Sequence, residues 1–248
     1  MTETAAGFPA PYVRLEPEAQ ARETVAVPRL CFGLKIVGND RSHPVGLYAQ
    51  VIFPRLCDHL LGRPWVAQHR RDVLTHAAGD VLEIGFGTGL NLPHYSPDVR
   101  RLTVIDPNAG MHRLAQRRVA HAAVPVERHV LAGERLPFPA GTFDCAVSTF
   151  TLCSIDDVRQ ALAEVYRVLK PSGRFLFLEH GLSPEPKVQT WQRSLNWLSG
   201  RLAGGCRLDR DVRVLVAGPP FARVEVTAFY ADRVPRTHGY LYRGVATK

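Results

Sequence analysis

Three glycines at alternate positions, Gly85, Gly87 and Gly89, are the residues whose type and spacing point most directly to chemistry. They follow the apolar run from Val81 to Ile84, which is typical of a strand buried on both faces of a sheet. Glycine has no Cβ and tolerates positive φ, so the backbone of this turn can lie close to a ligand. We predict that a helix begins near Leu90 and that strand, turn and helix form a nucleotide-binding corner.

A carboxylate stands at the distance from this turn that a ribose contact requires. The segment from Arg101 to Asp106 predicts a second strand, and Asp106 lies 19 residues after Gly87 (106 − 87). A carboxylate at about this offset accepts hydrogen bonds from the two hydroxyls of a ribose. Leu90 replaces the last glycine of the dinucleotide fingerprint, and the turn lacks the lysine of a P-loop. The pattern therefore excludes a P-loop and departs from the dinucleotide fingerprint.

The combination of Glu83, the Gly-x-Gly-x-Gly turn and Asp106 resembles the class I S-adenosylmethionine-dependent methyltransferases. Three later segments resemble motifs of that family in the same order: Gly-Glu-Arg-Leu-Pro-Phe over 133–138, Thr-Phe-Asp-Cys-Ala-Val over 142–147, and Arg-Val-Leu-Lys-Pro-Ser-Gly over 167–173. The resemblance implies S-adenosylmethionine as the cofactor. It also implies an α/β fold, a Rossmann-like, seven-stranded, mostly parallel sheet with helices on both faces, an antiparallel last strand and added N-terminal helices.

The resemblance also implies which residues bind the cofactor. The implied residues are Glu83, Gly85, Gly87, Gly89, Asp106, Pro107, Asn108, Gly133, Glu134 and Thr149. For Glu83 a second interpretation stays open, in which the side chain only holds the glycine turn. Ala132 stands where many relatives have an aspartate that contacts adenine, so the backbone of Gly133 or the side chain of Glu134 would replace that contact.

His180 is the candidate catalytic residue. It follows Glu179 at the end of an expected strand, and imidazole titrates close enough to neutral pH to act as a general base. A purely structural histidine is the alternative. Cys153 is interpreted as a small buried residue rather than a nucleophile. No Asn-Pro-Pro-Tyr-type motif follows the strand over 143–149, which argues against methylation of nucleobase amino groups.

A narrower resemblance concerns the methyl acceptor. The segments 105–108, 132–134, 151–154, 179–180 and 239–240 are similar to those of animal methyltransferase-like proteins that methylate alkyl thiols. This similarity implies a small-molecule acceptor and S-methylation of a thiol. Two alternatives stay open, a phosphatidylethanolamine-type N-methyltransferase at a membrane surface and a non-catalytic cofactor-binding module.

Alternating helices and strands must position these residues. We divide the chain into an N-terminal extension over 1–45, partly disordered or part of a lid, and a methyltransferase domain over 46–248 with an insertion over 181–208. Helices over 44–61 and 64–78 precede the first strand and are expected to form part of a lid. The later expected elements are a helix over 108–122, strands over 125–131 and 143–149, a helix from the cap Asp156 to Leu169, a strand over 174–179, helices over 188–202 and 209–216, and a reversed pair of strands over 221–230 and 239–247. In the inserted helix, Trp191, Leu195 and Leu198 form the expected apolar face.

The composition is that of a globular protein, because 46% of the 248 residues are hydrophobic. The net charge of +8 is spread over the chain without a run of five like charges, so nucleic acid is not the expected partner. Peripheral membrane contact and the oligomeric state are left open.

The five cysteines form no Cys-x-x-Cys pair, which predicts neither a metal site nor a disulfide framework. Without a long apolar stretch or a signal segment, the chain is predicted to be cytoplasmic.

Overall fold

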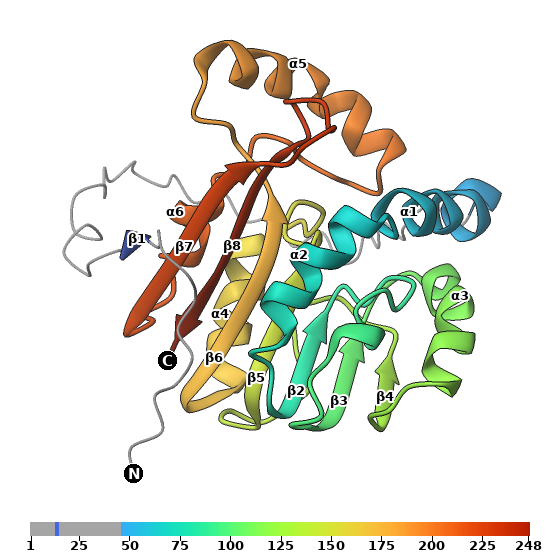
Figure 1. Ribbon diagram of the computed structural model, residues 1–248, viewed down its shortest axis with the longest axis vertical. Coiled ribbons are helices and arrows are strands. Elements are labelled where there is room, and N and C mark those ends of the chain that lie inside the picture. Colours follow the sequence, from blue (N-terminus) through green and yellow to red (C-terminus); the bar gives the residue numbers. More distant parts are fainter. Residues whose placement is uncertain (1–12, 15–45) are drawn as a thin grey trace, which may run out of the picture.

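The computed structural model describes residues 13–14 and 46–248 of the chain (Figure 1). Expectations for the rest of the segment 1–45 lie outside the described residues. The helical elements are η2 (Tyr48–Ile52), α1 (Phe53–Leu61), α2 (Pro64–Leu74), η3 (Leu92–His94), α3 (Ala109–Ala120), α4 (Val158–Val168), α5 (Pro186–Leu202) and α6 (Val212–Val216). The strands are β1 (Val13–Arg14), β2 (Gly79–Ile84), β3 (Val99–Ile105), β4 (Val126–His129), β5 (Phe143–Thr149), β6 (Leu169–His180), β7 (Arg223–Tyr230) and β8 (Tyr240–Thr247).

The strands form one mixed sheet in the order β1-β7-β8-β6-β5-β2-β3-β4. Strands β2 to β6 pair in parallel, whereas β8 runs antiparallel to both β6 and β7. The seven expected strands all occur, and the two-residue β1 adds to the edge at β7. The predicted fold class, a Rossmann-like and mostly parallel sheet with a reversed end, is therefore confirmed. Ile84 pairs with Ile105 on one side and Ser148 on the other, so the carboxyl ends of β2, β3 and β5 meet at one edge.

Two apolar layers cover the two faces of this sheet. Leu82 packs in the layer that includes α4 and α6, while its neighbour Val81 packs in the layer that includes α2 and α3. Figure 1 shows α2 crossing the near face and α4 lying behind the strands. Successive side chains of a strand point to opposite faces, so adjacent apolar residues such as Val81 and Leu82 suit a strand covered on both sides. The sequence of β2 therefore fixes its place in the middle of the sheet.

The expected helix after the glycine turn is wrong. Between β2 and β3 the chain forms only the single 3-10 turn η3, and the rest of the connection is irregular. Pro93 and Pro97 explain this, because each proline lacks the backbone donor of a continuing helix. The glycine turn thus has no long helix behind it.

The expected cap of α4, Asp156, is also wrong. The capping residue is the next one, Asp157, whose Oδ1 accepts a hydrogen bond from the Gln160 N–H at 3.0 Å.

The inserted helix α5 occurs where it was expected, but the prediction of its apolar face is wrong. Trp191 is 65% exposed and Leu198 38% exposed, whereas the buried residues are Val188 and Gln192. The amide of Gln192 bonds to three backbone groups, of Ser183, Gly181 and Thr237, at 2.9–3.1 Å. Because polar contacts to loops anchor the helix, Trp191 and Leu198 are left facing outward, and Leu195 alone of the three predicted residues is partly buried. In the described part of the chain, no helix is long and apolar enough to cross a bilayer.

Candidate functional site

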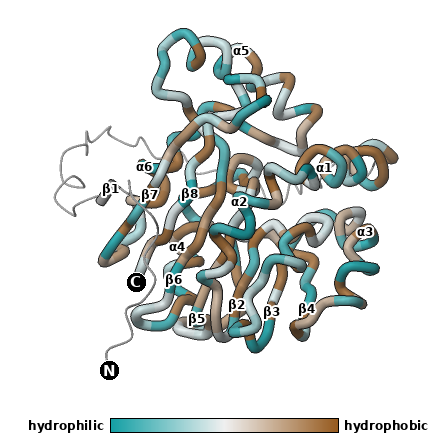
Figure 2. The backbone as a smooth tube through the Cα atoms, viewed as in Figure 1, coloured by the Kyte–Doolittle hydropathy of each residue, from teal (hydrophilic) through white to brown (hydrophobic). Residues whose placement is uncertain are grey.

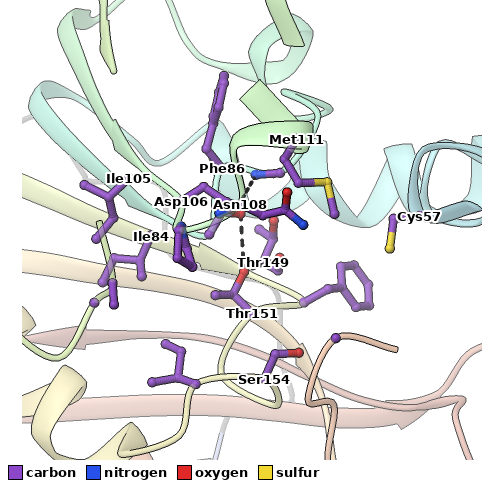
Figure 3. A pocket seen from close by; sticks show the side chains of 18 of the residues that line it. Cys57, Ile84, Phe86, Ile105, Asp106, Asn108, Met111, Thr149, Thr151 and Ser154 are labelled. Atoms are coloured by element: carbon purple, nitrogen blue, oxygen red, sulfur yellow. Dashed lines mark hydrogen bonds between the residues drawn. The ribbon is translucent and has the colours of Figure 1, made fainter. Parts of the chain in front are cut away.

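A cavity of about 460 Å³ opens at the edge where β2, β3 and β5 end (Figure 3). Its volume falls within the range of small-molecule sites. The glycine turn, the residues after β3 and the segment 131–134 form one part of the wall. Residues of the segment 149–156 and side chains of α1 and α2 form the other part, so the two early helices contribute to the wall.

Most of the predicted cofactor residues line this cavity. The lining includes Gly85, Gly87, Asp106, Pro107, Asn108, Gly133, Glu134 and Thr149. Glu83, Gly89 and the predicted base His180 are not among the lining residues. The structure therefore brings together residues that the chain separates by up to 64 positions (149 − 85).

Asp106 is held in a fixed orientation by the backbone. Its Oδ2 accepts a hydrogen bond from the Gly87 N–H and its Oδ1 accepts one from the Asn108 N–H, both at 2.8 Å. The Asn108 side chain caps α3 by accepting from the Gly110 N–H at 2.8 Å. A carboxylate oxygen can accept more than one hydrogen bond, so each of these oxygens can also receive a hydroxyl of a ligand.

Two glycines of the turn have different neighbours. Gly85 has φ +70°, and a Cβ there would collide with the Thr151 side chain. Gly87 has φ +57°, but a Cβ there would meet no protein atom closer than 3.9 Å, and the residue lines the cavity. The missing side chain of Gly87 therefore leaves its backbone accessible to a ligand. The missing side chain of Gly85 instead leaves room for another loop of the protein.

Glu83 lies beneath the turn and is 1% exposed. Its Oε1 accepts from Asn91 Nδ2 at 2.8 Å and its Oε2 accepts from the Tyr95 hydroxyl at 2.7 Å. Burial raises the pKa of Glu83 to about 7, and the hydrogen bonds from Tyr95 and Asn91 oppose that rise. With both oxygens engaged by the loop after the glycines, the geometry favours the interpretation in which Glu83 holds the turn.

Arg70 is a site residue that sequence reasoning missed. It projects from α2, is 4% exposed, and donates from one guanidinium nitrogen to Asn91 Oδ1 and Thr149 Oγ1, both at 2.6 Å. It lines the cavity, and its Nε has no hydrogen-bond partner among the described residues. Burial lowers the pKa of Arg70 to about 10, which leaves the side chain charged at neutral pH. The signal was its spacing, because Val66 and Val73 lie four residues before and three after it on the buried side of α2.

The loop after β5 carries a strained aromatic residue into the cavity wall. Phe150 has φ +55°, unusual for a residue with a Cβ, and the Arg70 guanidinium lies 5.3 Å from its ring centre. The buried carboxylate of Glu179 holds this loop by accepting from the N–H groups of Thr151 and Leu152 at 2.9 and 3.2 Å. Burial raises the pKa of Glu179 to about 7, against these hydrogen bonds and one from Ser148. Strain of this kind persists only where the surroundings hold it, and it gathers at functional sites.

His180 lies behind the cavity wall rather than on its surface. Its Nε2 is 3.3 Å from the Cys206 Sγ. Ligand atoms of Cys153, His180 and Cys206 all lie within 4.8 Å of one another. The spacing of the cysteines along the chain gave no hint of this cluster, because Cys153 and Cys206 are 53 residues apart (206 − 153).

The cavity suits a nucleoside that also carries a charged amino-acid group. Asp106 offers acceptors for a sugar diol, Gly87 offers accessible backbone, and Arg70 offers a positive charge. Apolar side chains of Met111, Leu131, Ile105 and others complete the wall beside segment 132–134. These groups match the ribose, the methionine part and the adenine of S-adenosylmethionine.

Comparisons with known proteins agree with this geometry. A family model described as a methyltransferase domain matches residues 82–177. The chain is 34% identical over 170 residues to the human thiol S-methyltransferase TMT1A, covering 65% of the chain and 69% of that protein. It is 33% identical over 150 residues to the rat thiol S-methyltransferase TMT1B, covering 59% of the chain and 61% of that protein, less than two thirds of its length.

Solved structures share the fold at low sequence identity. A SAM-dependent methyltransferase from Thermotoga maritima, described as a possible histamine N-methyltransferase, superposes with a TM-score of 0.59 at 19% identity, covering 82% of this chain and 98% of that one. A phosphoethanolamine N-methyltransferase from Haemonchus contortus, solved with S-adenosylhomocysteine, gives a TM-score of 0.61 at 14% identity, covering 79% of this chain and 57% of that one.

Proposed function

Because the chain belongs to the class I S-adenosylmethionine-dependent methyltransferases, we propose that it methylates the sulfur of a small apolar thiol. The observation that carries this proposal is the likeness to thiol S-methyltransferases, which at 34% identity extends over 170 residues. The wall opposite Asp106 supports it, because Phe53, Leu61 and Phe150 offer apolar surface there. A hydrophobic thiol suits such a wall better than a charged amine does.

Each group of the cofactor has a proposed partner. Asp106 accepts from the ribose hydroxyls, and Arg70 pairs with the α-carboxylate of the methionine part, a pairing that charge and burial both favour. The backbone of Gly87 lies against the methionine part. Gly133 and Glu134 serve the adenine, with Pro107 and Asn108 flanking it. Thr149 and Gly85 also line the cavity, while Glu83 and Gly89 keep the turn in shape.

Methyl transfer to a thiol is a displacement in which the bound cofactor would supply the methyl group of its sulfonium and leave as a neutral thioether, while the acceptor gives up its proton. The residues of this chain must hold the acceptor sulfur about 3 Å from that methyl and keep water out. The apolar side chains of α1 serve the second need. The thiolate form of the acceptor is the nucleophile.

His180 as the general base stays a prediction. It is not among the residues that line the cavity, so a proton would have to pass through an intermediate group. Ser154 lines the cavity, and its Oγ lies 3.4 Å from the Cys153 Sγ. Cys153 in turn belongs to the cluster that contains His180. If the relay exists, His180→Ala lowers turnover and alters the pH–rate profile while cofactor affinity stays unchanged.

A panel assay tests the proposed acceptor. The purified chain is incubated with methyl-labelled cofactor and matched series of alkyl thiols, amines and phenols, with Asp106→Ala as the blank. We expect label in the apolar thiols, with kcat/KM rising with chain length. Label confined to amines or phenols would overturn the thiol proposal and leave the methyltransferase assignment intact.

A second candidate, a phosphatidylethanolamine-type N-methyltransferase in peripheral contact with a membrane, is favoured by the apolar side chains around α1 and α5. The exposed residues are Leu47, Ile52, Leu56 and Leu60 near α1, and Trp191, Trp197, Leu198 and Leu202 on α5. Figure 2 shows the hydrophobic residues of α1. The Tyr48 hydroxyl donates to the Leu202 carbonyl at 2.6 Å, which joins the two groups into one surface beside the cavity.

Arg55 and Arg201 lie on the same two helices, and such basic, apolar surfaces bind anionic bilayers. Flotation with anionic and with neutral vesicles tests this contact. Trp191→Ser with Trp197→Ser should abolish flotation, whereas Val214→Ser, an equally exposed apolar site on α6, should leave it unchanged. Flotation combined with labelling of phosphatidylethanolamine, and of no thiol, would favour the second function.

A further inference from the structure

Two cysteines and a histidine from three separate elements meet next to the cavity. Cys153 belongs to the loop after β5, His180 is the last residue of β6, and Cys206 lies in the segment between α5 and α6. Cys153 and Cys206 are buried, at 4% and 8% exposure. The ligand atoms of all three residues lie within 4.8 Å of one another, and no other group of this kind occurs in the described residues.

This set of atoms has the composition of a zinc site. Zinc takes cysteine sulfur at about 2.3 Å and histidine nitrogen at about 2.0–2.1 Å in tetrahedral geometry, which places neighbouring ligand atoms about 3.6–3.8 Å apart. Here the His180 Nε2 and the Cys206 Sγ are 3.3 Å apart. Small side-chain rotations would therefore bring the three atoms to tetrahedral spacing. Two thiolates would also neutralise the charge of a divalent ion.

Hydrogen bonds and apolar contacts hold the segments of the two cysteines in place. The Arg207 N–H donates to the Cys153 carbonyl at 3.0 Å, which ties the segment of Cys206 to the loop of Cys153. The Leu208 N–H donates to Asn196 Oδ1 at 2.8 Å, which ties that segment to α5. Leu195 and Leu208 pack against the two cysteines and form an apolar shell. A preformed, apolar-walled cluster of this kind limits solvent access, as metal sites do.

We propose that Cys153, His180 and Cys206 bind one Zn²⁺ ion, which fastens the end of the inserted helix to the carboxyl ends of β5 and β6. The proposal rests on this cluster alone and does not depend on the identity of the methyl acceptor. It gives His180 the role of a ligand in place of that of a general base, because the relay through Cys153 would be closed by the metal. It also gives the 203–208 segment a reason to stay against the cavity, because Gly204 lines that cavity two residues before Cys206.

Metal binding by the full chain tests the proposal. The protein is purified under reducing conditions, stripped with a chelator and titrated with Zn²⁺ against a chromophoric competitor, and with Co²⁺ as a spectroscopic probe. We expect one Zn²⁺ per chain and, for Co²⁺, the thiolate charge-transfer band and tetrahedral d–d bands of a sulfur-ligated site. Both signals should be lost in Cys206→Ser and retained in Cys57→Ser.

If a cysteine variant fails to fold, thermal unfolding of the wild-type protein gives a second test. Stripping the wild-type protein should lower its melting temperature, and one equivalent of Zn²⁺ should restore it. His180→Asn, which keeps the thiols, should lose this response while keeping a cooperative unfolding transition. The proposal is overturned if reduced wild-type protein takes up no Zn²⁺ at micromolar concentration, or if Cys206→Ser binds Co²⁺ with the wild-type spectrum. A Cys153–Cys206 disulfide in protein purified under reducing conditions would overturn it as well.

Discussion

The two sides of the cavity are built in different ways. The cofactor side is centred on one stretch of 22 residues from Gly85 to Asp106 (106 − 85 + 1), in which the Asp106 carboxylate bonds directly to the Gly87 N–H. The acceptor side joins residues of α1, the loop after β5 and the turn at Gly204, which are far apart in the chain. Local sequence therefore encodes the first side, whereas the second depends on contacts that only the finished fold provides.

Gly85 is where the two sides touch, so its substitution should have the largest effect. The Thr151 Oγ1 donates to the Gly85 carbonyl at 3.3 Å, and Gly85→Ala would place a Cβ against the Thr151 side chain at positive φ. We expect the free energy of unfolding to fall by about 2–4 kcal/mol, from backbone strain together with overpacking. Chemical denaturation measures it.

Gly87→Ala is the matched control, because it has positive φ but no neighbour within 3.9 Å. It should lose only about 1–2 kcal/mol of stability, while cofactor affinity falls by a larger factor because the new methyl group faces the ligand. Equal stability losses in the two variants would contradict the distinction between a packed and a ligand-facing glycine.

Asp106→Ala should have the next largest effect, confined to the cofactor side. We expect affinity for S-adenosylhomocysteine to fall about 10- to 150-fold, or about 1.5–3 kcal/mol, the range for a hydrogen bond to a charged group. Calorimetric titration measures it, with the exposed Asp98→Ala as control. If the carboxylate binds the ribose, the wild type should prefer adenosine over 2′,3′-dideoxyadenosine, and the variant should not. A preference that survives in the variant would assign Asp106 only to the shape of the turn.

Arg70 tests whether a residue that the sequence motifs missed serves the cofactor. Arg70→Met should weaken S-adenosylhomocysteine about tenfold, because the α-carboxylate loses its charged partner. Affinity for 5′-methylthioadenosine, which lacks the amino-acid group, should change little. Arg71→Met, the exposed neighbour on α2, is the control. An equal loss for both ligands would mean that Arg70 acts by holding Asn91 and Thr149 in place.

Sequence reasoning succeeded where local pattern and structure coincide. The apolar runs predicted the seven main strands, and the glycine turn with Asp106 predicted one side of the cavity. It failed where a distant partner decides the outcome. In the sequence, Arg70 and Glu179 look like surface charges. In the structure, Arg70 lies on the buried side of α2, and Glu179 lies beneath the loop after β5. The face of α5 was misjudged for the same reason, because loops rather than the sheet receive its buried Gln192.

Substitution of Glu83 should have the smallest effect, and the sign of this effect follows from the raised pKa of the buried carboxyl. The carboxyl has an ordinary pKa of 4.5, and burial raises it to about 7 in the folded protein. Between those pH values the folded protein keeps a proton that the unfolded chain has lost, so Glu83 makes the free energy of unfolding fall as pH rises. Glu83→Gln removes that contribution, and we expect the change from pH 6 to pH 7.5 to differ from wild type by about 1 kcal/mol.

Urea unfolding at a series of pH values measures this difference, and comparison with wild type cancels the histidines that titrate in the same range. Glu185→Gln, whose side chain is 46% exposed and pairs with Arg236, should leave the pH dependence unchanged. If Glu83→Gln also leaves it unchanged, the carboxylate is ionised throughout. Its bonds from Asn91 and Tyr95, with the nearby charge of Arg70, would then outweigh its burial, and the glycine turn would rest on an ion pair rather than on a neutral network.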